Sequence, residues 1–200
     1  TPCGTLFPYT TLFRSMEDVF SRCSWGPFDS ALLSYYEFSL NTDREKRELY
    51  TRWRQMKRLW YSFDLSRQGG LAAILSLRDI HRFSRSSRLG LVVKPEYVNR
   101  GYGTEIIRGF MKYYFEVMKY RTLCLDVADF NKRALHCYTK CGFSRCGSFE
   151  REFPGRFELM NTAEFKKSAG CFTIRKNRIY AHYTDMKISR KDWKQRISQK

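Results

Sequence analysis

This 200-residue chain has few acidic residues for its many basic ones, and it has no long apolar segment. Its 20 aspartates and glutamates face 37 lysines and arginines, so the formal net charge is +17. No apolar run approaches the roughly eighteen residues that a membrane helix needs, and no signal-peptide pattern of charge, apolar stretch and small-residue cleavage site is seen. We therefore expect a cytoplasmic protein that makes no contact with a membrane.

Paired cysteines are missing as well. The chain has seven cysteines, an odd number without any Cys-x-x-Cys pair, which argues against both a disulfide framework and a zinc ribbon. Cys137 and Cys141 lie four residues apart with His136 beside them, a spacing that metal ligands can have. A second ligand pair is absent, so we interpret these cysteines as small packing residues on a helix and expect no metal.

Length and composition indicate one globular domain. Hydrophobic residues make up 42% of the chain and aromatic residues 16%, enough for a core without disulfides. Residues 8–15, PYTTLFRS, are the translation of a common sequencing-adapter end, so we expect residues 1–15 to be an artefact of sequence assembly. The alternative is a genuine N-terminal arm. The domain is expected to cover residues 16–190, and a basic tail residues 191–200.

Hydrophobic periodicity and turn residues predict a mixture of strands and helices. Thr42 followed by Glu45 predicts a capped helix with an apolar stripe from Leu49 to Trp60. Gly142 is expected to end a later helix, because glycine adopts the left-handed conformation of a helix C-cap without strain. Residues 78–87 are expected to form a loop. The remaining helices are expected at residues 28–36, 104–120 and 132–140, and strands at 19–23, 61–65, 71–77, 89–93, 122–128, 146–153 and 179–188.

A glycine-rich turn stands between the strand expected at 89–93 and the helix that follows it. The turn consists of Arg100, Gly101, Tyr102, Gly103 and Thr104. A strand that leads into such a turn at a helix N-terminus directs several backbone amides to one place, which suits a pyrophosphate. Short Gly-x-Gly turns also serve as plain connections, so this pattern alone leaves the function open.

A second motif lies at the appropriate separation: Asn131-x-x-Ala134-x-x-x-Tyr138, followed by Gly142-Phe143. Together the two motifs resemble the cofactor-binding core of the GNAT superfamily of acyl-CoA-dependent N-acetyltransferases, and the resemblance is clear over residues 88–145. It implies an α+β fold in which helices flank a central, mixed and mostly antiparallel twisted sheet with a splayed pair of parallel strands. It also implies acetyl-CoA as the cosubstrate and a primary amine as the acceptor.

The resemblance places the cofactor by position. The pantetheine arm is expected to pair with the backbone of Leu91, Val92 and Val93, as an added β-strand would. The pyrophosphate is expected at the amides of residues 100–104, where Arg100 could add charge. The family often has Arg or Gln three residues before the first glycine of this turn, and this chain has Val98 there. We therefore expect weak support of the phosphates from side chains.

Catalytic roles follow from the second motif. Tyr138 resembles the general acid that protonates the departing thiolate, and Ala134, one turn earlier, would leave room for the pantetheine arm. Asn131 would hold the arm, cap the helix, or do both. Asp126 matches the position of a base glutamate in ribosomal-protein N-terminal acetyltransferases and would act through water; the alternative is a structural carboxylate. Glu96 is a weaker candidate for the base.

Charge bears on the choice of acceptor. The C-terminal residues are strongly basic, and such a surface attracts RNA, ribosomes or an anionic cofactor, although it is more often a solvated end. We favour a protein amine, such as a ribosomal N-terminus, over a small amine of the polyamine, aminoglycoside or amino-acid type. A further alternative is a non-catalytic nucleic-acid- or ribosome-binding module. A monomer and a homodimer are both compatible with the sequence.

Overall fold

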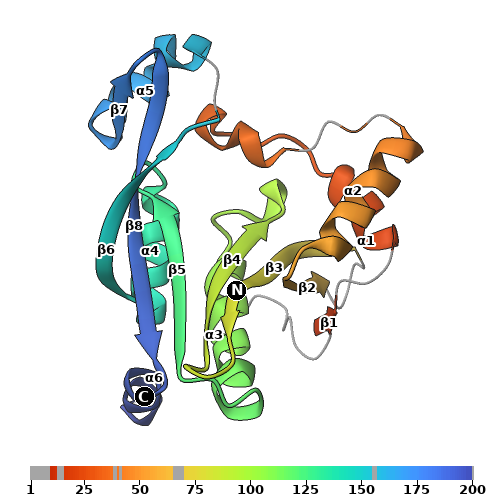
Figure 1. Ribbon diagram of the computed structural model, residues 1–200, viewed down its shortest axis with the longest axis vertical. Helices are drawn as coiled ribbons and strands as arrows, with labels where there is room; N and C mark the ends of the chain where they lie inside the picture. Colours follow the sequence, from red (N-terminus) through yellow and green to blue (C-terminus); the bar gives the residue numbers. More distant parts are fainter. Residues whose placement is uncertain are drawn as a thin grey trace.

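A computed structural model describes residues 10–12, 16–37, 40, 42–64, 70–154 and 157–199. These residues form an eight-stranded sheet in the order β1-β2-β3-β4-β5-β8-β6, with β7 beside β8 (Figure 1). Only β4 and β5 pair in parallel among the described strands, and the other neighbours are antiparallel. The strands are β1 (Thr10–Leu12), β2 (Leu59–Asp64), β3 (Leu71–His81), β4 (Ser86–Val93), β5 (Thr122–Ala128), β6 (Ser144–Glu152), β7 (Phe172–Arg175) and β8 (Arg178–Ser189).

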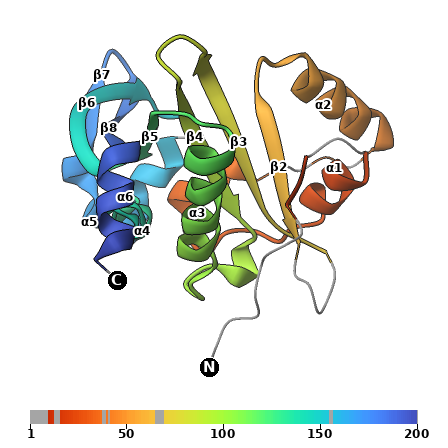
Figure 2. The same ribbon diagram turned by 90° about the horizontal axis from the view of Figure 1, so that it is seen from below.

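Helices flank both faces of the sheet, as expected from the sequence (Figure 2). α3 and α4 cover the face that holds the main core, and α1 and α2 cover the other face over β3. The helices are α1 (Met16–Cys23), α2 (Asp43–Gln55), α3 (Tyr102–Lys112), α4 (Lys132–Cys141), α5 (Ala163–Lys167) and α6 (Arg190–Ser198). Shorter turns are η1 (Ala31–Tyr36), η2 (Pro95–Tyr97), the π-turn η3 (Tyr113–Val117), η4 (Phe157–Asn161) and η5 (Ala169–Cys171).

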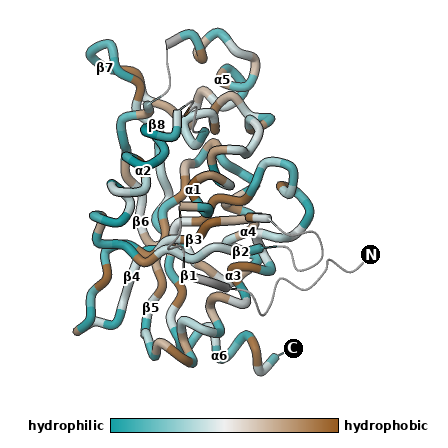
Figure 3. Tube along the Cα trace, turned by 90° about the vertical axis from the view of Figure 1, so that its right-hand side faces the viewer, coloured by the Kyte–Doolittle hydropathy of each residue, from teal (hydrophilic) through white to brown (hydrophobic). Residues whose placement is uncertain are grey.

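Alternation along β3 divides the apolar side chains between two cores. Leu75 packs with Ile107 and Phe110 of α3, whereas its neighbour Ile74 faces Trp53 of α2 on the opposite side. Each such fully buried side chain contributes about 1.5–3 kcal/mol relative to exposure. Figure 3 shows that α2, in contrast, is hydrophilic along much of its length, as expected for a helix that contacts the sheet by one narrow stripe. Both faces of β3 are therefore anchored, and the adjacent β4 is held in place.

Several local predictions are confirmed. Thr42 and Glu45 form the predicted capping box at the start of α2. The strand predicted at 122–128 is β5, with the same limits. Asn131 caps α4, and Gly142 ends it with a φ of 102° in the left-handed region. All of these signals are local hydrogen-bonding or steric rules, which is why the sequence alone could reveal them.

Other local predictions are wrong. Residues 19–23 belong to helix α1 rather than a strand, and Glu17 and Asp18 in its first turn favour the helix. The loop expected at 78–87 is mostly strand, because β3 extends to His81 and β4 starts at Ser86. Trp60 lies in β2, not on the helix, and reaches Trp53 by stacking across at 5.0 Å between ring centroids. Residues 78–87 were predicted as a loop because they are polar, but they are polar because the ends of these strands are exposed.

The structure describes parts of both chain ends. Of residues 1–15, only 10–12 are described, as β1 paired with β2; the remainder of the segment expected to be an assembly artefact lies outside the described residues. At the other end, residues 190–198 form α6, which starts with a capping box between Ser189 and Asp192. Trp193 is buried against Phe115 at 5.3 Å. Within the described residues, no helix has the length and apolar character required to cross a membrane.

Candidate active site

The two parallel strands separate where the resemblance predicts a wedge. β4 and β5 pair from Ser86 with Thr122 as far as Leu89 with Leu125, and no further. Beyond that point, the end of β4 pairs only with β3, and the end of β5 pairs only with β8. Each strand therefore turns one row of backbone groups into the gap. An extended, amide-containing ligand is the natural partner for such groups.

A cavity of about 310 Å³ occupies this wedge. Its walls come from the ends of β4 and β5, the N-terminal turn of α3, one face of α4 and the turn η1. Arg100 and Tyr102 do not line it; Arg100 is exposed, and the Tyr102 ring packs edge-on against Tyr97 at 5.5 Å. The predicted site residues that do line the cavity are Leu91, Val92, Val93, Gly101, Gly103, Thr104, Asp126, Asn131, Ala134 and Tyr138.

The glycine turn has the geometry of an anion site. Gly101 is the N-cap of α3 with a φ of 89°, a conformation that favours glycine. Its carbonyl accepts hydrogen bonds from the amides of Thr104 at 3.0 Å and Glu105 at 3.2 Å, which starts the helix. Gly103 lies in the first turn, and a Cβ there would come within 3.7 Å of the Cys137 sulfur. A phosphate at this helix end would meet backbone N–H groups and the positive end of the helix dipole.

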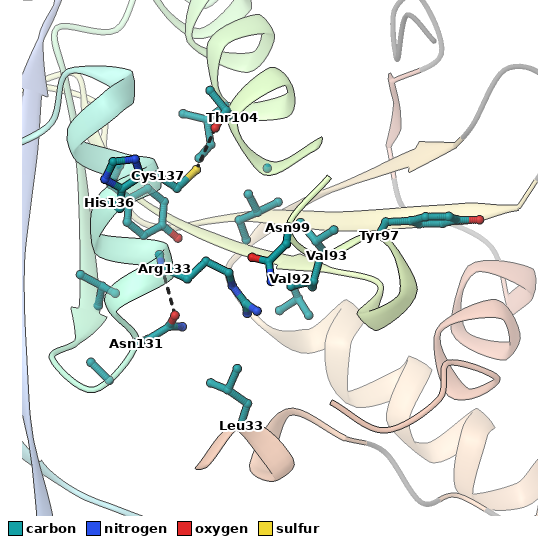
Figure 4. A pocket seen from close by; sticks show the side chains of 18 of the residues that line it. Leu33, Val92, Val93, Tyr97, Asn99, Thr104, Asn131, Arg133, His136 and Cys137 are labelled. Carbon is teal, nitrogen blue, oxygen red and sulfur yellow. Dashed lines mark hydrogen bonds between the residues drawn. The ribbon is translucent and has the colours of Figure 1, made fainter. Parts of the chain in front are cut away.

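Helix α4 forms the opposite wall (Figure 4). The Asn131 side chain accepts a hydrogen bond from the Ala134 amide at 3.1 Å, so its capping role is present. Arg133 extends from the first turn of α4 into the cavity, across from Val92 and Asn99. Burial lowers the pKa of Arg133, although the guanidinium stays charged. The sequence analysis missed Arg133, because the position between Asn131 and Ala134 is unspecified in the motif.

Tyr138 lies deep in the wedge. Its side chain is 8% exposed and packs edge-on against Phe143 at 5.9 Å. Burial raises its pKa well above the ordinary value, with a smaller contribution from Tyr36. A phenol in this setting retains its proton at neutral and moderately alkaline pH, which is the state that a general acid requires.

Asp126 is enclosed by arginines from three other strands. Its Oδ1 accepts hydrogen bonds from Arg78 of β3 and from Arg88 of β4, the latter at 3.3 Å. Its Oδ2 accepts from Arg151 of β6 at 3.1 Å. The Asp126 side chain is 6% exposed, whereas Arg151 is 49% exposed. Arg88 also binds Asp185 of β8. Both carboxylate oxygens of Asp126 therefore accept hydrogen bonds, and the partner of Oδ2, Arg151, is half exposed.

Glu96, the weaker candidate for the base, is exposed in η2 and forms an ion pair with Lys94 at 2.8 Å. The hydrogen bond from Lys94 lowers its pKa. It is not among the cavity-lining residues. A carboxylate with a lowered pKa outside the cavity is poorly suited to accept a proton from a bound amine.

Two further groups of lining residues escaped the sequence analysis. Phe28, Leu33 and Tyr36 form an apolar wall at and before η1. They come from a segment that ends more than sixty residues before the first motif, and nothing in their local pattern marks them as cavity residues. Cys137 hydrogen-bonds Thr104 across the cavity at 3.3 Å, and a hydrogen bond with Cys141 lowers its pKa. The sequence analysis had treated it as packing only.

Comparison with known proteins gives the family. A protein-family model described as acetyltransferase (GNAT) domain matches residues 16–144 of this chain. A spermidine N(1)-acetyltransferase of Vibrio cholerae is 29% identical over 93 residues, which are 46% of this chain and 54% of that protein. Its Escherichia coli K12 counterpart is 33% identical over 85 residues, 42% of this chain and 46% of that protein. The chain thus spans about half the length of the curated relatives it matches.

Solved structures agree on the fold. A Vibrio cholerae spermidine N-acetyltransferase in complex with CoA and spermine has a TM-score of 0.63 at 20% identity, covering 92% of this chain and 97% of that one. A chimera of the Vibrio cholerae enzyme with hSSAT has a TM-score of 0.64 at 19% identity, covering 93% and 98%. The chain belongs to the GNAT acetyltransferase family, so the family and fold predicted from the sequence are confirmed.

Proposed function

We propose that this protein is an N-acetyltransferase that moves the acetyl group of acetyl-CoA directly to a primary amine. The observation that carries the proposal is the wedge, because one continuous cavity connects unpaired strand edges, the glycine turn and Tyr138. The pantetheine arm would pair with the backbone of residues 91–93 and the pyrophosphate would bind at Gly101 and Gly103. Val98 supplies no hydrogen-bond donor from its side chain, so the backbone carries this part of the binding.

The proton balance of the reaction suits these residues. The neutral amine attacks the thioester carbonyl and forms a tetrahedral intermediate, which loses the CoA thiolate as the C–S bond breaks. Tyr138 donates its proton to that thiolate, and the nitrogen loses a proton to give the amide. Burial keeps the Tyr138 proton in place until the thiolate forms. Cys137 has no hydrogen-bonded histidine or carboxylate among the described residues, so a covalent acetyl-enzyme is not part of the proposal.

For the acceptor, we propose a small amine of the polyamine class. This revises the preference from the sequence, because the relatives found are spermidine acetyltransferases and none of them supports a ribosomal N-terminus. The apolar wall of Phe28, Leu33 and Tyr36 would contact the methylene groups of such a chain. The non-catalytic alternative has no support from these relatives either.

Asp126 fits the role of a cation anchor better than that of a base. Its oxygens already accept hydrogen bonds from guanidinium groups. An ammonium can take the place of one guanidinium and keep the charge pairing, whereas a transferred proton would neutralise the carboxylate beside the remaining arginines. Arg78 and Arg88 hold Oδ1 and are mostly buried, whereas Arg151 on Oδ2 is half exposed. We propose that a distal ammonium of the acceptor replaces Arg151 at Oδ2, and that the reacting nitrogen loses its proton to water.

A thiol-release assay with acetyl-CoA tests the function. The panel consists of spermidine, a monoamine of similar length, an aminoglycoside and a peptide with a free N-terminus. Release with spermidine and little release with the peptide is the expected result. No release with any amine, together with no heat on titrating CoA, would refute the enzyme assignment. Release with the peptide alone would restore the protein acceptor.

A further inference from the structure

A cluster of arginines lies at the end of the sheet opposite the wedge, where β4 and β5 begin and β8 ends. The backbone N–H of Arg121 donates to the carbonyl of Arg85 at 2.7 Å, and the N–H of Arg190 donates to the carbonyl of Arg121 at 2.8 Å. Three arginines from distant parts of the sequence therefore stand side by side, at about the 4.8 Å spacing of neighbouring strands. Figure 2 looks onto this end, with the β3–β4 hairpin and α6 beside it.

These arginines belong to a larger group of arginines and lysines that form no ion pair within the described residues. All of its members are exposed except the half-buried Arg190, and none of them forms an ion pair with a carboxylate of the described residues. Asp192, the acid nearest in sequence, is engaged by Ser189 in the cap of α6. We call this surface the basic end; its cations are Arg82, Arg85, Lys119, Arg121, Arg190 and Lys191.

Several arginines elsewhere in the described part of the chain are paired with acids. Arg78, Arg88, Arg151 and Arg178 all bind carboxylates. At the basic end the like charges repel one another, and the backbone hydrogen bonds of the sheet hold them together despite that cost. The excess charge there is a property of the fold, and a polyanion is the ligand that would relieve it.

An aromatic ring stands beside these charges. Phe83, at the tip of the β3–β4 hairpin, is fully exposed at 102% of its reference area, between Arg82 and Arg85. Exposed aromatic residues are platforms on which the bases of single-stranded nucleic acids stack. Guanidinium groups bind phosphate oxygens in a bidentate manner. The β3–β4 hairpin and the adjacent chain segments therefore offer an aromatic ring that could stack on a base and a row of guanidinium groups that could bind phosphates.

We propose that the basic end binds single-stranded nucleic acid, with a base on Phe83 and the phosphates along Arg85, Arg121 and Arg190. An anionic membrane is the less favoured partner, because insertion needs an apolar face and Phe83 is a single ring in a polar turn. This surface is at the opposite end of β4 from the wedge. The inference therefore does not depend on the proposed function.

The test is fluorescence anisotropy of the full chain with a labelled twelve-nucleotide oligouridine over a range of salt concentrations. Arg85→Gln/Arg121→Gln is the test variant. Arg47→Gln/Arg52→Gln, on exposed residues of α2, is the matched control because it removes the same charge from another surface. We expect the logarithm of affinity to fall with the logarithm of salt, and the test variant to reduce that slope by about 1.4, at about 0.7 per phosphate contact.

Phe83→Ala separates stacking from charge. It should weaken oligouridine binding about 5-fold or more while leaving the salt slope unchanged. Thermal melting confirms that the variants fold. Equal losses in the test and control variants would overturn the inference, since binding would then follow net charge alone. Absence of binding at 50 mM salt would overturn it too, as would Phe83-dependent binding to phosphatidylserine vesicles without binding to the oligonucleotide.

Discussion

Replacing Arg151 with glutamine should improve the use of polyamines. Arg151 donates to Oδ2 of Asp126 at 3.1 Å from a side chain that is half exposed. A distal ammonium of the acceptor must displace this contact in order to reach the carboxylate. A partly exposed pair of this kind is worth about 0.5–1 kcal/mol. Its removal should therefore lower KM for spermidine about 2- to 5-fold, given that about 1.4 kcal/mol corresponds to a factor of ten.

Steady-state thiol release measures this effect, with two controls. Arg178→Gln removes a somewhat more exposed arginine that binds Glu152 at 2.9 Å, so it reports the effect of net charge. A monoamine lacks the distal ammonium and should show no gain with Arg151→Gln. The reasoning about Asp126 is refuted if Arg151→Gln leaves KM for spermidine equal to that of Arg178→Gln, or raises it. A gain of the same size for the monoamine would also contradict it.

Four further predictions concern the catalytic and cofactor-binding residues. Tyr138→Phe should reduce kcat about 10²- to 10⁴-fold with little change in CoA affinity by calorimetry; unchanged turnover would exclude Tyr138 as the acid. Because burial raises the pKa of Tyr138, kcat should not decline as pH rises from 7 to 10 in the parent enzyme, and a decline centred below pH 10 would contradict a protonated acid. Asp126→Asn should raise KM for spermidine while preserving the increase of rate with pH, whereas a flattened profile would identify Asp126 as the base. Gly101→Val should strain a backbone at φ 89° and weaken CoA binding more than acceptor binding, which calorimetry with each ligand can decide.

The cofactor half of the site could be predicted from the sequence because its signals are local. A glycine at the start of α3 and an asparagine at the start of α4 suit the ends of helices, and Tyr138 follows Asn131 by about two turns of the same helix. The strand expected at 89–93 follows from its apolar residues. Each of these features needs only its own few neighbours, so the order of residues is sufficient.

The proposed acceptor half depends on contacts that no local pattern records. Asp126 meets Arg78, Arg88 and Arg151 only because β3, β4 and β6 bring them together across 25 to 48 residues of sequence. Phe28 and Leu33 of the apolar wall also line the cavity only because the fold brings a segment that is distant in sequence next to it.

The sequence by itself thus determined the family, the glycine turn and the position of Tyr138 on its helix, since helix caps and strand periodicity are short-range rules. Tertiary structure alone decided which of the described charged side chains form ion pairs and which do not. Arg85, Arg121 and Arg190 became neighbours through the pairing of strands at one end of the sheet, while Asp126 was surrounded near the other. Electrostatic interactions act through space, so the role of a charged side chain follows from the partners that the fold places beside it.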